Sequence, residues 1–161
     1  VSSIGLPDMP WLLTGALLIA AYLAQLVFAW RWEWLAVLQA NELYKQLTGL
    51  SLVLFFMMQW RLSVARMGSA SPATRLLTLH RDQGALAPLL LYLHAISLGH
   101  AYIRVMGLAF LGLVALGLLQ QPLARLNSNG LKTAWLVVHV ALAAALPLLI
   151  GYHAFNAFYY E

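Results

Sequence analysis

The sequence predicts an all-α fold, a polytopic membrane bundle of about five transmembrane helices that forms a single domain over residues 1–161. Of the 161 residues, 63% are hydrophobic and only 9% are charged, whereas soluble domains carry about 25% charged residues. The apolar residues fall into runs of about 20, the length at which a helix crosses a bilayer. We find no internal repeat, low-complexity linker or second domain along the chain.

Boundary signals mark the individual spans. Trp11 and Trp30 bracket the first, as is typical of side chains at the headgroup level. The second is weakly marked, with a strongly apolar core only at 50–60. The third begins with an N-cap serine and a proline at the first helical position, Ser71 and Pro72, and a turn at Gly99 follows it. The expected spans are 11–30, 44–60, 71–98, 101–119 and 132–155.

The charge pattern predicts an orientation. The net charge is +4, and the nine Lys and Arg residues are scattered between apolar runs, which excludes a nucleic-acid-binding surface. Five spans place the N-terminus, the 61–81 segment and the 120–132 loop on one side, with six basic residues against three on the other. Because cytoplasmic loops carry the excess of Lys and Arg, we expect the N-terminus in the cytoplasm. No basic segment precedes the first span, so no secretory signal peptide is expected.

Four histidines form two pairs with equal spacing. His80 and His94 lie 14 residues apart on the third span, as do His139 and His153 on the fifth. Fourteen steps of about 100° return to within about 40° of the starting direction, so each pair projects from one face of its helix. The third and fifth spans run parallel, because one span separates them. His80 therefore lies level with His139, and His94 with His153, with about 21 Å between the levels.

Two imidazoles that face each other across a bundle core suit a b-type haem. Histidine is a common axial ligand, and bundle cores commonly hold cofactors. The sequence therefore predicts two haem b groups, whose iron is bound axially by His80 with His139 and by His94 with His153. Zinc fits less well, because each level offers two histidines and no obvious carboxylate, and the chain has no cysteine.

A haem also needs room for the porphyrin and cations for its propionates. Small residues near the histidines are Gly84, Ala87, Ala141, Ala143, Ala144 and Ala145. The candidate cations are Arg75, Arg81 and Lys132 on the cytoplasmic side and Arg104 on the other.

Other interpretations of these residues stay open. A lone histidine within a span is more often a hydrogen-bonded packing residue than a ligand, and the repeated spacing is what favours ligation here. His100 lies about 120° from His94, and it is either an interfacial residue or a propionate partner or proton acceptor beside the outer haem. Glu42 and Lys45 are expected to form an i,i+3 ion pair at the outer surface, although either could contact a quinone or a partner.

A five-span chain with His-x13-His on its third and fifth helices resembles the ferric reductase-like transmembrane domain superfamily, a dihaem cytochrome b core. The resemblance covers residues 11–156 and includes the stretch from His80 through Gly84 to His94, and Trp135 four residues before His139. It implies an inner haem on His80 and His139, an outer haem on His94 and His153, and a multi-pass protein of the bacterial inner membrane. We expect no sixth span and no flavin or nicotinamide domain. The cytochrome b of quinol-oxidising bc complexes shares the spacing, on its second and fourth helices, and is the weaker resemblance.

Together these features predict a dihaem b-type cytochrome subunit that carries electrons across the membrane and has no catalytic domain of its own. Its donor would be a quinol or a flavoprotein, and its acceptor a partner redox subunit or a terminal acceptor. Membrane lipid, a redox partner subunit and a quinone are the expected partners. One alternative is a haem-free membrane anchor or assembly subunit. A proton or metal transporter is disfavoured, because the centres of the third and fifth spans contain no Asp or Glu.

Overall fold

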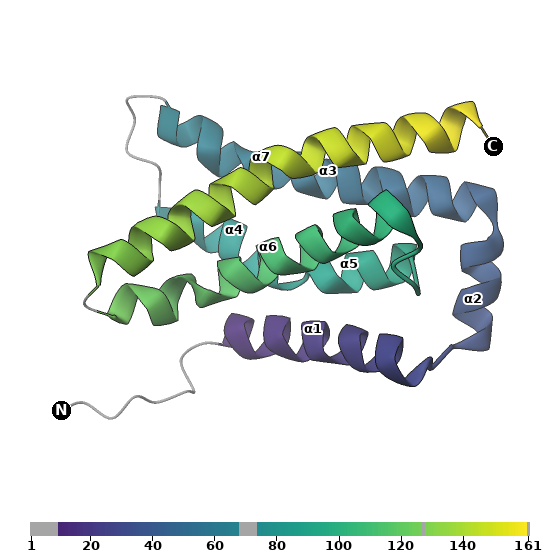
Figure 1. The fold of residues 1–161 in the computed structure, drawn as a ribbon, viewed down its shortest axis with the longest axis horizontal. Coiled ribbons are helices and arrows are strands. Elements are labelled where there is room, and N and C mark those ends of the chain that lie inside the picture. Colours follow the sequence, from purple (N-terminus) through teal and green to yellow (C-terminus); the bar gives the residue numbers. More distant parts are fainter. Residues whose placement is uncertain (1–9, 68–73, 127, 161) are drawn as a thin grey trace.

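The computed structural model describes residues 10–67, 74–126 and 128–160. These residues form helices and no strand (Figure 1), which confirms the expected all-α class. The helices are α1 (Pro10–Phe28), α2 (Glu33–Ala40), α3 (Glu42–Met67), α4 (Thr74–Ala85), α5 (Ala87–His94), α6 (Ala101–Arg125) and α7 (Asn129–Tyr159).

Four of the described helices, α1, α3, α6 and α7, are long and apolar enough to cross a membrane. Large apolar side chains are exposed along them, among them Val27 and Leu148, each 77% exposed. Soluble monomers rarely expose apolar surface on this scale, whereas lipid solvates it. The chain is therefore a membrane protein with several spanning helices.

The expectation of one continuous third helix is wrong. The segment forms two helices, α4 and α5, with Leu86 between them. The Leu86 N–H donates to the Gln83 carbonyl and the Leu89 N–H to the Leu86 carbonyl, so the backbone tightens to three-residue turns. The cause is Pro88, which has no N–H for the carbonyl four residues earlier and whose ring clashes with that carbonyl in a continuous helix.

The ends of the third segment also differ from expectation. α5 ends at His94 rather than at Leu98, and an irregular turn leads to α6. Gly99 in that turn has φ +61°, a left-handed conformation that favours glycine. The expected cap at Ser71 and Pro72 lies outside the described residues.

Side-chain caps define the second and fifth segments. Asn41 Oδ1 accepts from the Tyr44 N–H at 3.0 Å, so α3 starts at Glu42, close to the expected position. The Ser128 hydroxyl caps α7 in the same way. Helix α2, which lies across one end of the bundle (Figure 1), was not predicted from the sequence. The expected ion pair between Glu42 and Lys45 is wrong, because among the described residues the salt bridge that forms joins Arg81 and Asp82 instead.

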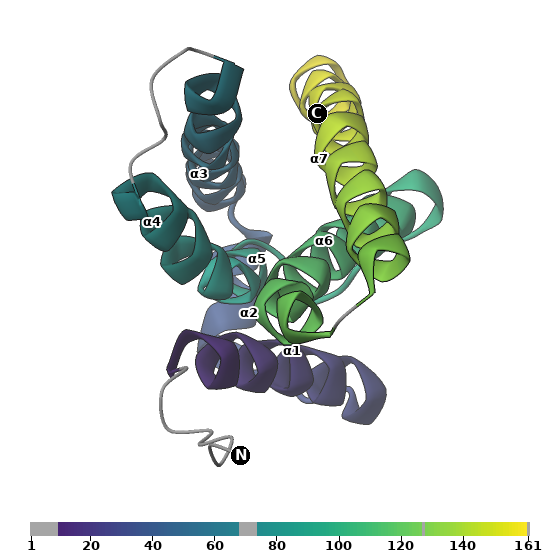
Figure 2. The same cartoon turned by 90° about the vertical axis from the view of Figure 1, so that its left-hand side faces the viewer.

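The helices pack around α6, which contacts α1, α4, α5 and α7. Figure 2 shows α3 and α4 on one side and α7 on the other, with α5 and α6 between them and α1 below. α7 packs mainly along α6, and it buries one side chain fully, Leu146. Leu146 joins Tyr22, Phe56 and Phe110 in the central apolar cluster.

The helix ends alternate between two ends of the bundle. The start of α1, the end of α3, the start of α4 and the junction of α6 with α7 lie at one end (Figure 1). α2, the turn between α5 and α6, and the C-terminus lie at the other. α4 and α7 therefore run in the same direction, which is the relation that level histidine pairs require.

Candidate functional site

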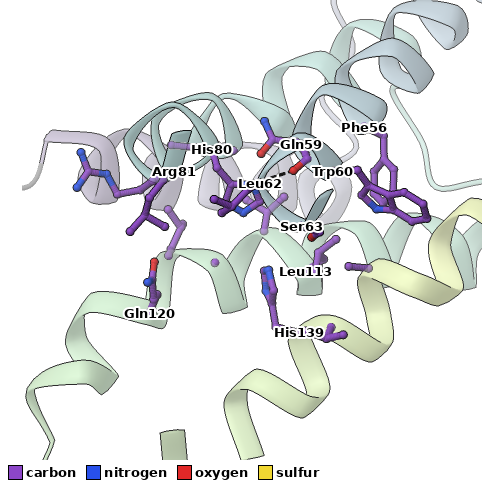
Figure 3. A pocket seen from close by; sticks show the side chains of 18 of the residues that line it. Phe56, Gln59, Trp60, Leu62, Ser63, His80, Arg81, Leu113, Gln120 and His139 are labelled. Atoms are coloured by element: carbon purple, nitrogen blue, oxygen red, sulfur yellow. Dashed lines mark hydrogen bonds between the residues drawn. The ribbon is translucent and has the colours of Figure 1, made fainter. Parts of the chain in front are cut away.

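The four histidines lie in two facing pairs. The ring centroids of His80 on α4 and His139 on α7 are 6.4 Å apart, and those of His94 on α5 and His153 on α7 are also 6.4 Å apart. The ring planes cross at 75° and 82°. Figure 3 shows His80 and His139 pointing toward one another from opposite helices. We call His80 with His139 the inner pair and His94 with His153 the outer pair.

The separation in both pairs fits a metal ion held between two imidazoles. A metal–nitrogen bond is about 2.0 Å long, and a ring nitrogen lies about 1.2 Å from the ring centre. The centroids of two opposed ligand imidazoles are therefore about 6.4 Å apart. Edge-to-face aromatic contacts fall in the same range, so the distance alone does not identify ligands. The value recurs at two levels, however, and the hydrogen bonds of the rings add a separate constraint.

A hydrogen bond at Nδ1 fixes the tautomer of His80. Its Nδ1 lies 3.3 Å from the carbonyl oxygen of Gln59 on α3. A carbonyl only accepts hydrogen bonds, so Nδ1 carries the proton and Nε2 carries the lone pair. Histidines that bind metals commonly donate their other N–H in this way. His80 is thus in the tautomer that a ligand needs.

His94 has the same tautomer, which is fixed by a hydrogen bond to a side chain rather than to the backbone. Its Nδ1 lies 3.1 Å from the Thr48 hydroxyl oxygen. That hydroxyl lies 2.7 Å from the Tyr44 carbonyl and 3.2 Å from the Lys45 carbonyl. Both carbonyls only accept, so the one hydroxyl proton is directed toward them and the hydroxyl oxygen accepts from His94 Nδ1–H. Gly49 allows this approach, because a Cβ there would lie 3.2 Å from Cε1 of His94.

Aromatic neighbours orient the two histidines of α7. Trp135 stacks on His139 with centroids 5.5 Å apart and planes 23° apart, and its indole N–H donates to the Leu116 carbonyl of α6 at 2.7 Å. His139 Nδ1 is buried with no hydrogen-bond partner in the described part of the chain. His153 lies 6.4 Å from the ring of Tyr102. The plane of the His139 ring is thus set by packing against Trp135.

A cavity of about 170 Å³ surrounds the inner pair and is lined by α1, α3, α4, α6 and α7 (Figure 3). Gly84 and Ala143, two of the small residues expected near a porphyrin, line this cavity, whereas Ala87 is buried in the central cluster. Ala141, Ala144 and Ala145 do not line it. The volume is below the roughly 300 Å³ at the lower end of ligand pockets.

The cavity has cations, but not all of the expected ones. Arg81 lines it, and its Nε is paired with Asp82 at 2.9 Å while its guanidinium lies 4.9 Å from the centre of the Trp11 ring. Arg66 at the end of α3 also lines it, and sequence reasoning missed that residue.

The other expected cations lie elsewhere. Arg75 is exposed on α4, and neither it nor Lys132 lines the cavity. Arg104 is exposed, and its Nε donates to the Gly99 carbonyl at 3.3 Å. His100 is exposed at the start of α6 and makes no side-chain cap. The structure thus brings Arg66 and Arg81 to the inner pair. Neither of the described pockets is lined by the outer pair, and none of the expected cations is placed beside it by a pocket.

Side chains from three other helices hold the end of α5, where His94 lies. Helix C-termini leave carbonyls without partners, and lipid cannot supply them. The donors are Tyr22 to Ala95 at 3.0 Å, Gln25 to Ile96 at 2.6 Å, Gln39 to Tyr92 and Leu93 at 2.8 and 3.1 Å, and Tyr44 to Leu93 at 3.1 Å. Sequence reasoning missed these residues, although a glutamine inside an apolar run was an available signal.

The described residues contain no group of three or more His, Asp or Glu side chains that could hold a metal ion. The donor sets are therefore two pairs of imidazoles, which leave a bound metal to obtain its remaining ligands from a macrocycle or from solvent. No protein-family model, curated protein or solved structure matches this chain.

Proposed function

We propose that this protein is a dihaem b-type cytochrome subunit that carries electrons across a membrane. The observation that carries the proposal is the repeated pairing of histidines, with centroids 6.4 Å apart at both levels. A packing role would explain one such pair, but it gives no reason for two pairs with the same separation and the same 14-residue spacing. The resemblance to the ferric reductase-like transmembrane superfamily rests on these same residues.

The inner pair would hold one haem b and the outer pair the second. Haem iron, when bound, supplies one-electron chemistry between the ferric and ferrous states. The hydrogen bonds to Nδ1 of His80 and His94 leave Nε2 of each ring available as a ligand. On the opposite side, α7 contributes one ligand to each level, so a single continuous helix fixes their spacing at about 21 Å.

The surrounding residues suit this role. Arg66 and Arg81 supply positive charge beside the inner pair, where propionates would need it. Trp135 stacks on the His139 ring and fixes its plane. We propose that α4 and α5 together cross the membrane, which brings the number of spans to five. The N-terminus would lie in the cytoplasm, and the protein in a bacterial inner membrane. A quinol or flavoprotein would be the donor, and a partner redox subunit or a terminal acceptor would receive the electrons.

Haem stoichiometry tests the proposal directly. The protein is expressed with a haem precursor, purified in mild detergent and measured for haem content per chain, together with its reduced-minus-oxidised absorption spectrum. We expect a b-type α band and two haems per chain. The nearly perpendicular ring planes should also give strongly anisotropic low-spin ferric signals in electron paramagnetic resonance.

Single-histidine variants assign the levels. His80→Ala and His94→Ala should each leave one haem per chain, and the double variant none. His100→Ala is the matched control, because His100 is exposed and pairs with no other histidine ring in the described structure. A wild-type chain that binds no haem would overturn the proposal and favour a haem-free anchor subunit. Loss of haem in the His100 variant alone would overturn the assignment of ligands.

A further inference from the structure

We infer that Thr48 is a positioning residue for the outer haem, and that its hydroxyl lowers the reduction potential at the outer level alone. This inference rests on the proposed function. Thr48 on α3 faces His94 across the packing of α3 against α5. It touches neither histidine of the inner pair, whose hydrogen bond comes from a backbone carbonyl.

The hydrogen bonds form a directed chain. His94 Nδ1–H donates to Thr48 Oγ1 at 3.1 Å, and the same hydroxyl donates to the Tyr44 carbonyl at 2.7 Å. A hydroxyl that donates is polarised, and its oxygen becomes a better acceptor. Thr48 should therefore draw the Nδ1 proton away from the ring more strongly than an isolated hydroxyl would.

This bond has a consequence for a ligated iron. A stronger acceptor at Nδ1 raises the basicity of the ring and its donation to the metal. A more electron-rich ligand stabilises ferric over ferrous iron, and this lowers the potential. Removing the acceptor should raise it.

The two levels differ in how this bond can be altered. His80 bonds to the Gln59 carbonyl at 3.3 Å, a contact that no side-chain substitution removes. His94 also has a backbone partner, Lys45, but its 3.1 Å bond to the Thr48 hydroxyl is made with a side chain and is open to mutation. Gly49 and the carbonyl contacts at the end of α5 constrain the ring independently of Thr48. Loss of the hydroxyl should therefore change the bond while the ring keeps its place.

The test compares three variants of the full haem-loaded chain. Thr48→Val removes the hydroxyl and keeps the shape, and Thr48→Ser keeps the hydroxyl. Ser51→Ala is the matched control, because Ser51 lies on the same helix and its hydroxyl donates to the carbonyl four residues earlier at 2.8 Å, as the Thr48 hydroxyl does. Each variant is titrated potentiometrically while the α band is recorded, with and without His80→Ala, which leaves only the outer haem.

We expect Thr48→Val to raise the outer potential by about 59 mV, the equivalent of a tenfold change in the one-electron equilibrium constant. The inner potential, Thr48→Ser and Ser51→Ala should stay at wild-type values. Selective loss of the outer haem in Thr48→Val, with retention in Thr48→Ser, would also support the inference.

Unchanged potentials in Thr48→Val, or equal shifts at both levels, would overturn this inference and leave the dihaem proposal intact. A wild-type chain without haem would overturn both. If Thr48→Val does not accumulate, Thr48→Ala carries the same expectation, because it removes the same acceptor.

Discussion

Replacing Gln39 with leucine tests whether buried hydrogen bonds at the end of α5 hold the outer pair in place. Gln39 lies on α2 and is 8% exposed. Its Nε2 donates to the carbonyls of Tyr92 and Leu93, the two residues that precede His94. After substitution the Leu93 carbonyl keeps its bond from Tyr44, whereas the Tyr92 carbonyl loses its side-chain partner.

The expected loss follows from these contacts. A buried hydrogen bond contributes about 0.5 to 1.5 kcal/mol net, and polar contacts in membrane proteins average about 0.6 kcal/mol. Two bonds therefore give about 1 to 2 kcal/mol. The Oε1 of Gln39 is buried without a partner, and removing it offsets part of the loss. We expect Gln39→Leu to lower the free energy of unfolding by about 1 kcal/mol.

The assay is a denaturant titration in mixed micelles, followed by far-UV circular dichroism. Gln46→Leu is the control, because Gln46 is exposed on α3. In the haem-loaded protein, Gln39→Leu should also release the outer haem faster than the inner one. Equal unfolding free energies for the two leucine variants would refute the reasoning.

Three further substitutions probe other contacts. Gly49→Ala places a methyl group 3.2 Å from Cε1 of His94, and it should weaken retention of the outer haem only, measured as haem per chain. The control is Gly151→Ala, whose methyl group meets open space and which should retain both haems. Gly15→Val brings its Cβ within 2.7 Å of the buried Leu118 side chain and should lower the free energy of unfolding by about 1 to 3 kcal/mol through overpacking, with Gly112→Val as the unhindered control. Arg66→Gln removes a cation from the inner cavity and should speed haem release from the inner level, and a variant that releases haem at the wild-type rate would show that Arg66 does not contact it.

The relation between the histidines was accessible from the sequence because it is a helical property. A separation of 14 residues returns to nearly the same face of any regular helix, and parallel helices place equal spacings at equal heights. The pairs therefore meet even though Leu86 interrupts the segment that carries His80 and His94. Whether these pairs bind haem stays a prediction.

The cations that line the inner cavity could not be identified from their positions in the sequence. Arg75, Lys132 and Arg104 lie close to the histidines in sequence or at the ends of their spans, yet none of them lines the cavity. Arg66 lies 14 positions before His80 on another helix and does line it. Proximity across a bundle depends on the rotation and tilt of each helix, and hydrophobic periodicity fixes neither once most of a helix faces lipid.

By itself, the sequence determined that the chain is an all-α membrane protein, where most of its long helices run and which histidines share a face, because composition and helical period are local properties. Only the tertiary structure decided that α2 lies across the bundle end, that Thr48 accepts from His94, and that Gln25 and Gln39 satisfy carbonyls 71 and 53 residues away. The physical reason is the low polarity of the surroundings. An unpartnered carbonyl is costly there, and the chain satisfies it with whichever donor the packing brings near. Because that donor can lie far away in the sequence, no local sequence pattern predicts it.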